Sequence, residues 1–136
     1  MEHMDILEQA KELREDVLEP NAARWEQEQR QPADDLRAAI ARGFAGLDLG
    51  PEYGGLGISF SEKLAVCEEL AKGCFAFTFA LINTGNIAAK MAASQSPFHR
   101  QHIPALVSGE LFGATALTEP EAGSDFAAIT TLATET

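Results

Sequence analysis

The spacing of apolar positions predicts that the first hundred residues are helical. Between Asp5 and about Arg30, apolar residues recur at intervals of four, three and four, which is the period of one helix face: Ile6, Ala10, Leu13 and Val17. Pro20 should interrupt this helix, because proline has no N–H to donate. Beyond it, Trp25 stands alone on a polar segment. We expect Trp25 to anchor that segment to the core.

Two more amphipathic helices follow. One begins near Pro32–Asp35, where carboxylates lie at the positive end of the helix dipole, and its predicted buried face is Leu36, Ala39, Ile40 and Phe44. The other is capped by Ser59 or Ser61 and ends near Gly73. Its predicted buried stripe is Phe60, Leu64, Cys67, Ala71 and Cys74.

The segment from Phe75 to Ala93 is apolar on most sides. Alternating aromatic residues at its start also permit a short strand, but the length of the segment favours a helix that is buried all round. A shorter helix should run from about Phe98 to Ser108 and end at Gly109.

After Gly109 the pattern changes from helical to extended. Residues 111–117 alternate weakly, and residues 129–134 are rich in threonine, so both segments are predicted strands. Two strands do not make a stable sheet. We therefore expect a helical domain over residues 1–110, followed over 111–136 by the opening strands of a truncated β-domain.

Charge and composition exclude several classes of function. The 136 residues include 21 acidic and 10 basic side chains, for a net charge of −11, which disfavours nucleic acid and an anionic membrane surface as partners. The N-terminus lacks the features of a signal peptide, and no apolar run reaches the roughly 20 residues that span a bilayer. Cys67 and Cys74 lie too far apart along a helix for a disulfide, which favours free, buried thiols and a cytoplasmic location.

Two glycine-rich loops carry the most specific sequence signals. Residues 49–57 read LGPEYGGLG, a structured turn that matches neither a Rossmann nor a Walker pattern. Residues 113–131 read GATALTEPEAGSDFAAITT. This second stretch resembles the signature of the acyl-CoA dehydrogenase family. The first loop with the following Glu68-Glu69-Leu70, and more weakly residues 106–110, resemble the same family in the same order.

The resemblance implies a flavin site in the second loop. In the family, the positions from Thr115 through Ser124 line FAD, among them Thr115, Ala116, Leu117 and Thr118, with Thr118 facing the ring. Gly123 allows close approach of the backbone, and the position of Ser124 lies near phosphate and the acyl-CoA thioester arm. Backbone N–H groups and small hydroxyls suit such contacts because nothing bulky intervenes. Glu119 and Asp125 should hold the turn, and Glu121 departs from the usual glycine and should point to solvent.

The remaining polar residues give weaker signals. The alternative to a flavin site in the second loop is an ordinary surface turn, rich in proline and glycine, with no ligand. His99 and His102 lack a third ligand, so no metal site is expected, and the adjacent Glu68 and Glu69 point to different helix faces and form no catalytic dyad. No catalytic residue is assigned. Thr78 and Ile82, one turn apart on the apolar helix, are candidates for lining an acyl pocket.

The resemblance implies a function for a longer protein. Family members oxidise an acyl-CoA between Cα and Cβ with a carboxylate base and FAD, pass electrons to an electron-transferring flavoprotein, and usually form tetramers. Their fold is an up-and-down helical domain, a β-domain and a helical bundle. We expect this chain to be the N-terminal third of such an enzyme and inactive alone. A flavin oxidase or monooxygenase of the same fold, and a stand-alone helical interaction domain that catalyses nothing, are the alternatives.

Overall fold

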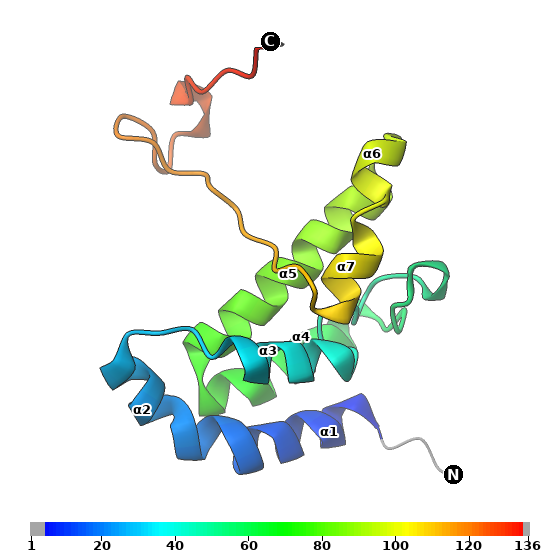
Figure 1. Ribbon diagram of the computed structural model, residues 1–136, viewed down its shortest axis with the longest axis vertical. Helices are drawn as coiled ribbons and strands as arrows, with labels where there is room; N and C mark the ends of the chain where they lie inside the picture. The colour runs from blue at the N-terminus through cyan, green and yellow to red at the C-terminus, as the bar shows by residue number, and fades with distance from the viewer. Residues whose placement is uncertain (1–4, 135–136) are drawn as a thin grey trace.

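A computed structural model describes residues 5–134 of the chain, and helices make up most of it (Figure 1). The α-helices are α1 (Ile6–Leu13), α2 (Glu19–Glu28), α3 (Ala33–Ala41), α4 (Phe60–Gly73), α5 (Phe75–Ala93), α6 (Pro97–Arg100) and α7 (Ile103–Ser108). One π-helical segment (Arg14–Leu18) joins α1 to α2, and single 3-10 turns lie at Pro51–Tyr53 and Phe126–Ala128. No helix in this described part is both long and apolar enough to cross a membrane.

Pro20 does not end the first helix, contrary to the sequence-based expectation. The chain stays helical from α1 to α2 through the π-helical segment, in which the N–H of Glu19 donates to the carbonyl of Arg14. Pro20 then occupies the first turn of α2, directly after the π-helical segment, whose wider turn interrupts the regular α-helical hydrogen-bond ladder at the point where proline has no N–H to donate. Trp25 is 6% exposed and stacks on Phe77 with ring centroids 5.7 Å apart, which confirms it as an anchor.

The buried stripe predicted for α4 is wrong. Phe60 is 74% exposed and Leu64 49%, whereas Val66, Glu69 and Leu70 are the buried residues of the helix. The helix packs on α1 and the π-helical segment, and these contacts select the face that holds Glu69. Cys67 and Cys74 are free, but each is only half-buried.

Burial of Glu69 depends on charge pairing. Its carboxylate accepts hydrogen bonds from Nε of Arg14 at 2.7 Å and from Nζ of Lys72 at 2.5 Å. A carboxylate paired in this way can lie against a core, whereas an unpaired one would be costly to bury.

The long α5 is the centre of the fold, and it is helical throughout, as predicted. It packs against α3, α4, α6 and α7. Its buried side includes Phe77, Leu81 and Ala88, but Phe75 and Phe79 are 71% and 57% exposed, so the helix is not buried all round. The aromatic start of α5 is therefore partly uncovered.

The end of the helical part differs slightly from the prediction. Residues 97–108 form two short helices, α6 and α7, instead of one, and Gly109 ends α7 with φ +80°, a value that favours glycine. Ile103 and Leu106 of α7 pack with Leu49 and Ala88 in a second apolar cluster. The loop before α4 supplies Leu49, so this cluster holds the glycine-rich turn against α5.

The two predicted strands do not form in the described residues. Residues 111–117 and 129–134 are extended but have no ladder partner, and the one β-bridge joins Glu119 to Ala122 within a tight turn. An extended segment becomes a strand only when another strand satisfies its N–H and C=O groups. In Figure 1 this part of the chain crosses α5 and then leaves the helices.

Candidate functional site

The extended segment after α7 is fixed to the helical body at its start. The N–H of Leu111 donates to the carbonyl of Ala105 at 2.9 Å, and the N–H of Gly113 donates to the Thr84 hydroxyl on α5 at 3.1 Å. A Cβ on Gly113 would lie 2.9 Å from Cβ of Ile87, too close for any side chain. This close approach determines where the segment crosses α5.

Beyond Gly113 the main chain is open to solvent. Thr115, Ala116, Leu117 and Thr118, the predicted flavin contacts, are all exposed. Among the residues that the structure describes, none accepts a hydrogen bond from the main-chain N–H groups of residues 114–118. The structure thus brings these four residues together as a strip of unpaired donors and acceptors.

The loop that follows is held by one carboxylate. Glu119 accepts hydrogen bonds from the N–H groups of Thr130 at 2.8 Å and Thr131 at 2.9 Å, and from both threonine hydroxyls. These bonds, the Thr130 N–H first, lower the pKa of Glu119 to about 2 from its ordinary value of 4.5. Asp125 likewise caps the next turn by accepting from the N–H of Ala127 at 3.1 Å. Glu119 and Asp125 therefore make the structural contacts that the sequence predicted.

Gly123 and Ser124 lie at the exposed tip of this loop. A Cβ on Gly123 would meet no atom within 4 Å, and the backbone there does not require glycine, because φ is not in the left-handed region. Nothing in the described chain explains this glycine, whereas a bound group that approaches the backbone would. The neighbouring side chain of Glu121 is exposed and forms no hydrogen bond with the described residues.

An open hollow of about 500 Å³ lies between α5 and the extended segment. The segment contributes Thr115 and Leu117, two of the predicted contacts, and α5 contributes Phe79, Asn83, Asn86, Ala89 and Lys90. Sequence reasoning missed this face of α5. The signal was present, because residues 79, 83, 86 and 90 follow the four-three-four spacing of one helix face.

Thr78 and Ile82, the residues expected to line an acyl pocket, are not among the lining residues of this hollow. Thr78 is 2% exposed, and its hydroxyl donates to the carbonyl of Cys74 at 2.9 Å. Ile82 is half-buried. Their role in an acyl pocket stays a prediction.

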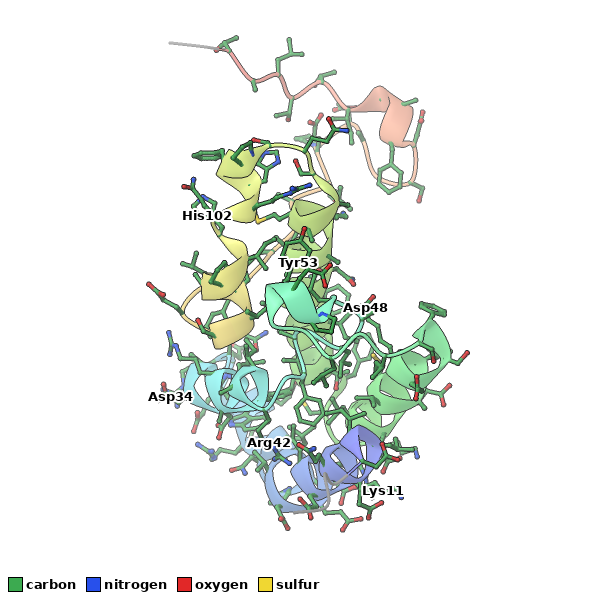
Figure 2. The ribbon with its side chains drawn as sticks, turned by 90° about the vertical axis from the view of Figure 1, so that its right-hand side faces the viewer. Lys11, Asp34, Arg42, Asp48, Tyr53 and His102 are labelled. Carbon is green, nitrogen blue, oxygen red and sulfur yellow. The ribbon has the colours of Figure 1, made fainter. Side chains whose placement is uncertain are left out.

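A buried lysine connects the hollow to the glycine-rich loop. Nζ of Lys63 donates to Oδ2 of Asp48 at 2.8 Å and to Oδ1 of Asn86 at 3.3 Å, and its side chain is only 12% exposed. Figure 2 shows Asp48 on the loop next to the turn that carries Tyr53. These contacts orient the Asn86 amide, with its oxygen toward Lys63.

The two histidines considered from the sequence have structural contacts. Nδ1 of His99 lies 2.7 Å from the Ser94 hydroxyl, and His102 packs edge-on against Phe98. Figure 2 shows His102 on the short helices at the end of the helical part. Within residues 5–134, no group of three His, Cys, Asp or Glu side chains could hold a metal ion.

Comparison with known proteins places this geometry in context. Residues 1–110 match the family model described as the N-terminal domain of acyl-CoA dehydrogenase. Mitochondrial isobutyryl-CoA dehydrogenase of Bos taurus is 34% identical over 119 residues, which cover 85% of this chain and 28% of that protein. Acryloyl-CoA reductase (NADH) of Anaerotignum propionicum is 34% identical over 127 residues, covering 91% of this chain and 32% of the reductase.

Comparison with solved structures also finds members of the acyl-CoA dehydrogenase family. The glutaryl-CoA complex of glutaryl-CoA dehydrogenase superposes with a TM-score of 0.83 at 27% identity, covering 92% of this chain and 33% of that one. The chain thus spans about a third of the length of the relatives it matches. From the match to its first 110 residues, the chain belongs to the acyl-CoA dehydrogenase family and carries the N-terminal helical domain of that family.

Proposed function

We propose that this chain forms the N-terminal part of an FAD-dependent acyl-CoA dehydrogenase, which introduces a double bond between Cα and Cβ of an acyl-CoA thioester. The observation that carries the proposal is the strip of unpaired main-chain groups at residues 114–118, in a chain of this family. The N–H and C=O groups of such a strip are free to pair with a bound group in place of water. Relatives of this chain include a glutaryl-CoA dehydrogenase with glutaryl-CoA and PigA with FAD.

The residues present fit a flavin. The main chain of residues 115–118 and the Thr118 hydroxyl would hold the ring, and Gly123 leaves room for a phosphate or the thioester arm to approach the backbone next to the Ser124 hydroxyl. FAD, when bound, would accept the hydrogen that leaves Cβ as hydride. The hydrogen bond between Thr84 and Gly113 fixes the extended segment on α5, so a flavin held by that segment would lie beside α5.

The catalytic base is not assigned to any residue of this chain. Glu69, the most buried carboxylate among the described residues, is committed to Arg14 and Lys72, and Glu119 to Thr130 and Thr131. We propose that the base and most FAD contacts belong to a further part of the protein, that electrons pass to an electron-transferring flavoprotein, and that the complete enzyme is a homotetramer.

The test uses the full-length product of the gene that encodes this chain. The purified protein should show flavin absorbance, and acyl-CoA should bleach that absorbance under anaerobic conditions. Thr118→Val should lower flavin occupancy, whereas Thr134→Val, an exposed control, should not. The 136-residue chain alone should bind FAD weakly and turn over no acyl-CoA. Stoichiometric flavin with turnover in the 136-residue chain would refute the proposal that the base and most FAD contacts belong to a further part of the protein.

A flavin oxidase or monooxygenase of the same fold is the second candidate. PigA, solved with FAD and proline, superposes on this chain with a TM-score of 0.79 at 25% identity. The discriminating measurement is oxygen uptake during turnover. A dehydrogenase should need an added electron acceptor, whereas an oxidase should consume oxygen at the rate of substrate oxidation. A full-length product that binds no flavin would favour the non-catalytic interaction domain.

A further inference from the structure

The hollow beside α5 has one apolar end and one polar end. Phe79 provides an aromatic ring, while Asn83, Asn86 and Lys90 continue the same helix face for three turns. Thr115 and Leu117 form the opposite wall, and they belong to the strip proposed to lie against FAD. A substrate group that extends from the flavin along α5 would therefore meet the amides and the ammonium group.

The two amides have unused hydrogen-bonding capacity. The half-buried Asn83 side chain has no hydrogen-bond partner among residues 5–134. Asn86 accepts from Lys63, and its NH2 group donates to no described residue. Polar groups at the wall of a hollow are normally satisfied by water or by a ligand. Here the groups left over from Asn86 are donors, which favour an acceptor oxygen.

The charge of the hollow is opposite to that of the chain. None of its lining residues is acidic, although the chain has 21 Asp and Glu and a net charge of −11. Within the described part, eight Lys and Arg side chains form ion pairs, and Lys90 and Arg100 form none. An uncompensated ammonium group beside free amide donors is suited to a carboxylate.

We infer that the acyl group taken by this chain carries a carboxylate beyond the reacting carbons, and that Asn83, Asn86 and Lys90 select it. The inference rests on the proposed function, since it places an acyl-CoA in the hollow. These three are specificity residues and take no part in the bond-breaking steps. Phe79 packs against the apolar methylene groups of the same acyl chain.

A matched pair of substrates tests the selection in the full-length enzyme. Glutaryl-CoA and pentanoyl-CoA have five acyl carbons each and differ in the terminal carboxylate. We expect kcat/KM to favour glutaryl-CoA by roughly 10- to 100-fold, as hydrogen bonds to a charged group provide. Lys90→Met and Asn83→Leu should each lower this ratio, and Asn83→Asp, equal in size but negative, should bring it to one or below. Lys11→Met, a distant control, should leave the ratio unchanged.

Binding provides a second readout that does not require turnover. Calorimetry with the unsaturated products, glutaconyl-CoA and pent-2-enoyl-CoA, should show the same preference and its loss in Lys90→Met and Asn83→Asp. Circular dichroism and flavin content of each variant separate misfolding from lost recognition. A wild-type ratio near one, with flavin bleached by both substrates, overturns this inference and leaves the proposed function intact. Flavin that no acyl-CoA bleaches overturns both.

Discussion

Glu119 shows how a single residue organises the candidate site. Its two carboxylate oxygens accept from main-chain and hydroxyl donors of Thr130 and Thr131, and its own N–H and C=O pair with Ala122. The strip at 115–118 and the tip at 123–124 lie on either side of this residue. A carboxylate is needed there because only an acceptor without N–H groups can receive all these donors.

The low pKa of Glu119 makes the loop sensitive to acid. Because the folded pKa, about 2, lies below the ordinary 4.5, the stabilisation is fully present above pH 4.5 and is lost as pH falls through about 2. The carboxyl carbon signal of Glu119 in NMR should titrate with a midpoint near 2, and the amide signals of Thr130 and Thr131 should follow it. Glu119→Gln should leave one of the two amides without an acceptor at neutral pH, because glutamine keeps a single acceptor oxygen, and Glu121→Gln should affect neither amide. A midpoint near 4.5 would mean that the hydrogen bonds do not persist in solution.

Two glycines should differ in how alanine at their positions changes stability. A Cβ on Gly85 would lie 2.5 Å from the carbonyl oxygen of Ala45, whereas one on Gly123 meets nothing. Overpacking costs about 1–3 kcal/mol, more than the roughly 1 kcal/mol that alanine gains over glycine in a helix. Urea unfolding should show that Gly85→Ala is destabilised, by on the order of 1 kcal/mol. Gly123→Ala should keep its stability within about 0.5 kcal/mol but lower flavin occupancy of the full-length protein.

At the scale of elements, neighbouring residues determine where α4 begins, whereas residues far away in sequence determine which of its faces is buried. Ser59 and Glu62 form a capping box, with the Ser59 N–H donating to Glu62 at 2.8 Å and the Glu62 N–H donating to Ser59 Oγ at 3.3 Å. The cap depends on residues three positions apart, so it could be predicted. The buried face depends on Arg14 and α1, which lie far away in sequence, so it could not.

The capping box gives a prediction with an internal control. The sequence offered Ser59 and Ser61 equally, and the structure assigns the cap to Ser59. Ser59→Ala should lower the free energy of unfolding by about 1 kcal/mol, because the Glu62 N–H in the first turn of α4 loses its acceptor. Ser61→Ala, on the exposed first turn, should change it by less than about 0.5 kcal/mol. Equal effects in urea denaturation would contradict the assignment.

The whole molecule leaves large apolar side chains uncovered. Phe60, Phe75 and Phe98 are each more than 65% exposed, and Leu132 near the end of the described chain is 86% exposed. Single exposed apolar residues are ordinary in folded domains, but this number within residues 5–134 is typical of surface that other parts of a protein cover. The short length of the chain relative to its relatives agrees with that interpretation.

The exposed phenylalanines should make the 136-residue chain self-associate. Sedimentation velocity should show a weight-average mass that rises with protein concentration. The double variant Phe60→Ser and Phe75→Ser should reduce this rise with little loss of stability, because neither ring contributes to the buried core. Gln95→Ser, an exposed polar control, should have no effect. A monomer at all concentrations would show that this surface is tolerated in water.

Local patterns determined much of this protein. Helix periods, caps and turn glycines predicted the helical part, the burial of Trp25, the stop at Gly109 and the structural role of Glu119. The two loop motifs identified the family, since they depend on residues adjacent in sequence. These features were accessible because their physical causes operate over a few residues.

Only the tertiary structure decided which faces and partners these elements use. Tertiary contacts bury Glu69 instead of Leu64 and keep the chain helical through Pro20. They also bring Asn83 and Lys90 of α5 to the same hollow as Thr115, a grouping that the sequence did not predict. The tertiary structure leaves residues 111–117 and 129–134 without strand pairing. Each outcome depends on contacts between segments distant in sequence, and a local pattern cannot specify such contacts.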